Sequence, residues 1–147
     1  MRVPKNLLTT LRDQVNALVV GDPDNQRHYN NAIDALNRAI NSNAWTDGSH
    51  LRNNGSMVFA AIADATRELL RIHNSSSAVT AIIAALADTA RELAQIALDQ
   101  AVVENRNPRQ IADAQQKLQE GDASIASGDF VGAIQSFKRA WQCASQR

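Results

Sequence analysis

The sequence predicts an all-α protein, a helical bundle of five or six helices with a long central helix over about residues 77–104. Three observations lead to this prediction. Glycine and proline leave long uninterrupted windows, since no glycine lies between Ser56 and Glu120 and no proline between Asp24 and Asn107. Apolar residues recur every three or four positions within those windows, which is the spacing of one helix face. No stretch alternates apolar and polar residues for long enough to form a strand.

The composition fits one folded domain over residues 1–147, and the abrupt start of the chain suggests a fragment of a longer protein. Hydrophobic residues make up 44% of the chain but aromatic residues only 4%, so the apolar content is mainly aliphatic, with much alanine. Alanine is the strongest helix former. The 15 basic residues balance the 15 acidic ones. Because the net charge is zero, we expect no nucleic-acid partner.

Two further features of the sequence limit the cellular environments that fit the chain. There is no run of about 18 consecutive apolar residues, so we expect no insertion into a membrane. Cys143 is the single cysteine, which excludes a disulfide within the chain. A reducing compartment and a bacterial exported protein both remain compatible with one free cysteine.

The first half of the chain predicts three helices and one long loop. The first helix covers about 4–20 and ends before a glycine. The second covers about 23–40, with Asp22 as its expected cap, and the third begins near Ser56, also an expected cap. Residues 41–55 are rich in Asn, Ser and Gly and form the one long irregular segment.

The second half predicts the longest helix and then a helical hairpin. Apolar residues in the helix over 77–104 keep a near-heptad spacing and cover a wide face, so we expect burial on more than one side. Asn107 and Pro108 open a fifth helix, which Gly128 ends, and a sixth helix follows from Phe130.

The long loop holds the main candidate functional residues. Asp47 and His50 are the best candidates for a metal site or an acid–base pair, because their side chains are common metal ligands and proton carriers. A structural interpretation is favoured over this one. In it, Trp45 and Leu51 anchor the loop on the bundle, while Asp47 and Ser49 satisfy the amides of a turn.

Elsewhere the sequence lacks the usual catalytic signatures, such as a phosphate-binding glycine-rich loop, a histidine-pair zinc motif or a nucleophile elbow. We therefore expect no enzyme activity and no cofactor. His28 and His73 are expected on the surface at helix ends, and Cys143 as a small packed residue. Trp141 is expected in the core, with an exposed anchor for a partner as the alternative.

Residues 108–145 resemble a single tetratricopeptide hairpin. The resemblance is carried by Gly121, by the turn Gly128-Asp129-Phe130, and by Ala133, Phe137 and Ala140. The chain departs from that repeat at Lys117 and Ser124, where large aromatic residues are usual. The resemblance implies a helical hairpin, but one repeat alone does not make a peptide-binding groove.

A second resemblance covers nearly the whole chain. It is carried by Ala-Leu-x-x-Ala-Ile at 35–40, by Trp45, Asp47 and Leu51, by Val58-Phe59 and Glu68-Leu69-Leu70, and by Gly121-Asp122, Gly128, Ala133-Ile134 and Ala140-Trp141. In this order and spacing the chain resembles an uncharacterised helical domain found near the C-terminus of large secreted or cell-surface proteins of bacteria and archaea. The resemblance implies export, an accessory role and no chemistry of its own, and it assigns no functional residue.

Three functional hypotheses follow. The leading one is a non-catalytic accessory, interaction or spacer domain of a prokaryotic extracellular protein, which contacts a protein partner or neighbouring domains of the same chain. The first alternative is a cytoplasmic tetratricopeptide-like adaptor that binds a peptide or protein. The second is a metal-binding or enzymatic protein that uses the loop over 45–51.

Overall fold

The computed structural model describes residues 3–19, 25–72 and 77–145, and within these ranges it contains six α-helices. The prediction of an all-α helical bundle is confirmed. The helices are α1 (Pro4–Val19), α2 (Gln26–Ile40), α3 (Ser56–Leu70), α4 (Ser77–Val103), α5 (Pro108–Ala126) and α6 (Phe130–Ser145).

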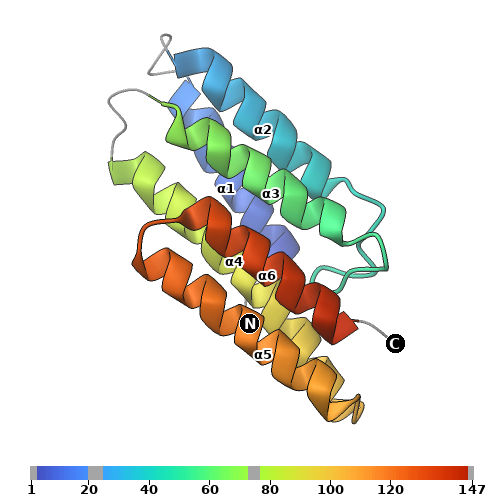
Figure 1. Ribbon diagram of the computed structural model, residues 1–147. Helices are drawn as coiled ribbons and strands as arrows, with labels where there is room; N and C mark the ends of the chain where they lie inside the picture. The colour runs from blue at the N-terminus through green and yellow to red at the C-terminus, as the bar shows by residue number, and fades with distance from the viewer. Residues whose placement is uncertain (1–2, 20–24, 73–76, 146–147) are drawn as a thin grey trace.

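The six helices form two layers, as Figure 1 shows. One layer has the order α2, α3, α6, α5, and the other consists of α1 and α4 behind it. Helix α4 packs against α1, α3, α5 and α6, so four neighbours cover it. Its buried side chains accordingly lie on a wide face: Val79, Ile82, Ile83, Leu86, Ala87, Thr89, Ala90, Leu93, Ala94, Leu98 and Ala101. This breadth fits a helix enclosed on several sides.

Helices α3 and α6 lie side by side although about half the chain separates them in sequence. Phe59 of α3 and Trp141 of α6 are both buried, and their ring centroids are 5.8 Å apart in a tilted arrangement. Aromatic pairs prefer such tilted geometry to a face-to-face stack. This contact closes the layer between the N-terminal and C-terminal parts of the chain.

Local signals set the boundaries of the C-terminal helices. The side chain of Asn107 accepts a hydrogen bond from the amide of Arg109 and caps α5. Gly128 follows α5 with φ of +85°, a conformation that costs glycine little. The next residue, Asp129, accepts a hydrogen bond from the amide of Gly132 at 2.9 Å and so caps α6.

Some predicted boundaries need correction or cannot be compared. Ser56 was predicted to cap α3, but it is the first helical residue, and Gly55 occupies the cap position without a side-chain hydrogen bond. The first amides of α3 instead donate to backbone carbonyls, for example that of Met57 to Asn54 at 3.1 Å. The predicted cap Asp22 lies outside the described residues.

Candidate functional site

The loop between α2 and α3 contains a small hairpin. Trp45 and Leu51 pair as an isolated antiparallel bridge. The amide of Thr46 donates to the carbonyl of His50 at 3.0 Å, and the amide of Arg52 donates to the carbonyl of Ala44 at 2.7 Å. These backbone hydrogen bonds hold the loop in one shape, although its sequence is rich in residues typical of irregular structure.

Three anchors fix this hairpin on the bundle. The buried ring of Trp45 donates a hydrogen bond from Nε1 to the carbonyl of Ala39, near the end of α2, at 2.7 Å. At the tip of the loop, the carbonyl of Gly48 accepts from the amide of Lys5 in α1 at 3.0 Å. Leu51 is partly buried and packs against the hydrophobic core. The loop is thereby attached to both layers.

Gly55 lets the loop approach α6 closely. A Cβ atom at this position would lie 2.6 Å from Cβ of Leu51 and 2.6 Å from the ring of Trp141. No side chain larger than hydrogen fits there without a shift of these neighbours. Trp141 itself is only 5% exposed, so it lies at the edge of the core, beneath the loop.

Asp47 and His50 lie together on the exposed tip of the loop. One carboxylate oxygen of Asp47 accepts from the amides of Ser49 at 2.7 Å and His50 at 3.0 Å. Nδ1 of His50 lies 3.0 Å from both carboxylate oxygens. The hydrogen bonds from the Ser49 amide and the His50 ring lower the pKa of Asp47 below its ordinary value. Asp47 thus acts as a turn acceptor, and Ser49 takes part through its own amide.

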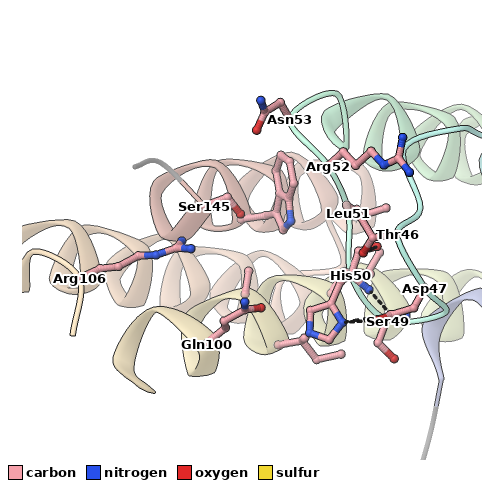
Figure 2. A pocket seen from close by; sticks show the side chains of 14 residues that line it. Thr46, Asp47, Ser49, His50, Leu51, Arg52, Asn53, Gln100, Arg106 and Ser145 are labelled. Atoms are coloured by element: carbon pink, nitrogen blue, oxygen red, sulfur yellow. Dashed lines mark hydrogen bonds and ion pairs between the residues drawn. The ribbon is translucent and has the colours of Figure 1, made fainter. Parts of the chain in front are cut away.

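This arrangement orients the imidazole of His50. A carboxylate only accepts hydrogen bonds, so the proton of a neutral His50 ring lies on Nδ1, facing Asp47. Nε2 is then left as an acceptor. Figure 2 shows the ring beside α4, with Asp47 on one side of it and Gln100 on the other.

A hollow of about 660 Å³ lies between this loop, α4 and the C-terminal end of α6, and we term it the loop hollow. Polar residues of the loop form one wall, and part of its floor is apolar. Its lining consists of Thr46, Asp47, Ser49, His50, Leu51, Arg52, Asn53, Leu93, Ile96, Ala97, Gln100, Arg106, Trp141 and Ser145. The hollow therefore brings together four of the five residues singled out from the sequence, namely Asp47, His50, Leu51 and Trp141. The fifth, Trp45, does not line it and is buried in the core.

Arg106 connects the end of α4 to α6 on the other side of the loop hollow. Its guanidinium donates to the carbonyl of Ala144 near the end of α6 and lies 3.2 Å from the carboxylate of Glu104. The preceding Asn105 has φ of +54°, and the amide of Arg106 donates to Ala101 at 3.0 Å. This backbone arrangement is typical of a helix end with a left-handed residue. It directs the arginine toward α6, a contact that no local pattern of residues predicts.

Other candidate residues have structural surroundings. His28 was expected on the surface, but its side chain is only 17% exposed and Nδ1 lies 2.9 Å from the carboxylate of Glu68 in α3. Cys143 is partly buried against the core, and this burial raises the pKa of its thiol. Among the described residues, no three or more His, Cys, Asp or Glu side chains form a group that could hold a metal ion. His73 lies outside those residues.

The C-terminal hairpin, α5 and α6, packs into the bundle. Helix α6 contacts α3 and α4 as well as α5, and its larger apolar side chains, such as Ile134 and Phe137, are fully buried. A Cβ atom on Gly121 of α5 would overlap the ring of Phe137, so the two helices are in close contact. The face of α6 that a peptide would need is thus occupied by the chain itself, which argues against a tetratricopeptide-like groove there.

Comparisons with models of protein families, with curated proteins and with solved structures found no match to this chain. None of the described helices combines the length and apolar character that crossing a membrane requires.

Proposed function

We propose that this chain is a non-catalytic interaction domain and that the loop hollow is its docking surface. The observation that carries the proposal is the attachment of the loop: Trp45, Gly48 and Leu51 each contact the bundle, beside an open hollow. A preformed surface loses little conformational entropy when a partner binds, and so retains more of the contact energy as affinity.

The chemistry of the loop supports docking rather than catalysis. The carboxylate of Asp47 accepts two amides of its own turn and lies beside the ring of His50. Both side chains are largely open to water, at 61% and 43% exposure. General acids, general bases and metal ligands gain their strength from sites that exclude water. Here the pair shapes the turn and leaves Nε2 of the His50 ring to form a hydrogen bond with a partner.

The resemblance to helical domains of secreted and cell-surface proteins supports the biological setting that we propose. In that setting the domain works outside a prokaryotic cell, next to other domains of the same chain. Its partner is either one of those domains or a separate protein.

A photo-crosslinking experiment tests the proposed docking surface. Gln100 in the loop hollow and Gln14 on α1 are both exposed glutamines, and only Gln100 lines the hollow. Each is replaced in turn by a benzophenone amino acid, in the full chain and in the cells that produce it. We expect crosslinked products at position 100 and few at position 14. The crosslinked segment, once identified and purified, should bind the protein and bind the Gln100→Arg variant less tightly.

The proposal is overturned if position 100 gives no products beyond those of position 14. Metal analysis of the purified protein addresses the remaining alternative. One bound metal ion per chain that is lost in His50→Ala would favour the metal-binding hypothesis.

A further inference from the structure

The charged residues of the loop hollow differ in how they are paired. Asp47 is held by His50 and by amides of its own turn, and Arg106 is held by Glu104 and Ala144. Arg52 also lines the hollow and is exposed. Within the described part of the chain, no carboxylate and no other acceptor binds its side chain. Arg52 is therefore the bordering charge that remains available to a partner, at the end of the hollow away from Gln100 and Arg106 (Figure 2).

An unpaired guanidinium favours an anionic partner group. Arginine presents planar, parallel N–H donors that match two oxygens of a carboxylate or of a phosphate. Among the described residues, Asp47 is the acidic one that lines the loop hollow, and its carboxylate already accepts hydrogen bonds within its own turn. An acidic side chain of a partner would thus complement Arg52 without displacing an existing pair.

Helix α4 adds aliphatic side chains to the same surface. Leu93, Ile96 and Gln100 line the loop hollow at a spacing that places them on one helix face. Val103 continues this row by one further turn, and its side chain is 81% exposed. The neighbouring Val102 is 51% exposed. Aliphatic side chains therefore flank Gln100 on this face, and the exposed ones offer burial to an apolar partner side chain.

Resting on the proposed function, we propose that the loop hollow binds a protein segment in which an Asp or Glu lies close to Leu, Ile or Val. The acidic side chain pairs with Arg52, and apolar side chains of the segment pack on Ile96 within the hollow and on Val103 beyond its edge. Gln100, and the free ring nitrogen of His50, face the hollow and serve the backbone of the segment, since an amide and an imidazole can bond peptide groups.

Selection from a random twelve-residue peptide library displayed on phage tests this specificity. The full chain is the bait, and the selected peptides are then synthesised and their affinities measured by fluorescence polarisation. We expect the selected sequences to be enriched in acidic residues near aliphatic ones. Arg52→Gln should weaken their binding by about tenfold and reduce its dependence on salt. Val103→Ser should also weaken it.

Arg38→Gln provides a matched control, because Arg38 is an exposed arginine on α2 that pairs with Asp64 and does not line the loop hollow. Its effect on peptide affinity should stay within about twofold. Unfolding curves of the three variants confirm that each is folded before affinities are compared.

The outcomes separate the two proposals. One outcome would overturn this specificity but leave the docking surface in place. In it, the selected peptides lack acidic residues and bind Arg52→Gln as tightly as the natural chain, while Gln100→Arg weakens their binding. Peptides that are insensitive to every substitution in the hollow, or no selected peptides at all, would overturn the inference. The crosslinking result then decides whether the docking surface itself stands.

Discussion

Two hollows on the surface of this bundle have very different charge arrangements. The smaller, of about 360 Å³, lies between α2 and α3 and is lined by Asn31, Asp34, Arg38, Asp64, Arg67, Glu68 and Arg71. Each of its three arginines lies within 3.4 Å of a carboxylate. The loop hollow is larger and partly apolar, and its Arg52 has no such partner.

The difference distinguishes a surface whose charges hold two helices together from a surface that is open to a partner. In the smaller hollow, Arg38 of α2 pairs with Asp64 of α3. Glu68, which also lines it, contacts His28 of α2. These charges connect two neighbouring helices and leave little for a further partner. In the loop hollow, backbone hydrogen bonds and the two tryptophans hold the walls. The charged side chain of Arg52 is not needed for that purpose, and it remains free.

The largest expected effect concerns the floor of the loop hollow. Leu93→Ala should lower the free energy of unfolding by about 2–5 kcal/mol, because Leu93 is 2% exposed and its loss leaves a cavity beside the central helix. Leu70→Ala is the control. Leu70 is 52% exposed, so its loss should change stability by less than about 0.5 kcal/mol. Equal losses in urea unfolding would contradict the central position of α4.

A smaller effect is expected where the loop meets α6. Gly55→Ala should cost about 1–3 kcal/mol, because the added methyl group would overlap Leu51 and the ring of Trp141. The backbone of Gly55 has φ of −61°, which alanine adopts easily, so the cost would come from packing alone. Unfolding followed by tryptophan fluorescence measures it. A variant as stable as the natural chain would show that the loop can move away from α6 at little cost.

The smallest effect concerns the hollow between α2 and α3, and it depends on pH. The hydrogen bond from His28 lowers the pKa of Glu68 below its ordinary value of 4.5. The unfolded chain therefore takes up this proton at a higher pH than the folded chain does. The resulting stabilisation is present above pH 4.5 and is lost as the pH falls through the folded-state pKa.

Glu68→Gln removes that contribution, which we expect to be about 0.5–1 kcal/mol for a partly exposed group. Urea unfolding between pH 3 and pH 7, in steps of about half a pH unit, measures the free energy of unfolding of the variant and of the natural chain at each pH. The two stabilities should converge at the acidic end. A constant difference across the range would mean that Glu68 acts through packing and not through its charge.

Sequence reasoning worked best where the signal is local. The cap of Asn107 on α5 and the glycine turn at Gly128 depend on residues within three positions of the helix end. The prediction that Asp47 satisfies turn amides named no donors, and in the structure they are the amides of Ser49 and His50, two and three residues further on. The prediction of Ser56 as a cap was wrong, because the first amides of α3 donate to backbone carbonyls of the preceding turn.

Interactions between helices could not be predicted in the same way. His28 and Glu68 are 40 residues apart, and neither has a motif around it that points to the other. The contact of Arg106 with Ala144 spans 38 residues. Such pairs depend on how far each helix is rotated about its axis and how closely it lies to its neighbour, and small changes in either would separate them.

The sequence by itself determined the helices, most of their ends and the irregular segment between α2 and α3, because these follow from hydrogen bonds and steric limits within a few residues. Only the tertiary structure decided that this segment stands beside α4 and α6 and encloses a hollow with a free Arg52. The physical reason is that the burial of apolar faces decides which helices pack together. Which charged side chains have a partner depends on that packing, so the unpaired ones cannot be identified from local sequence.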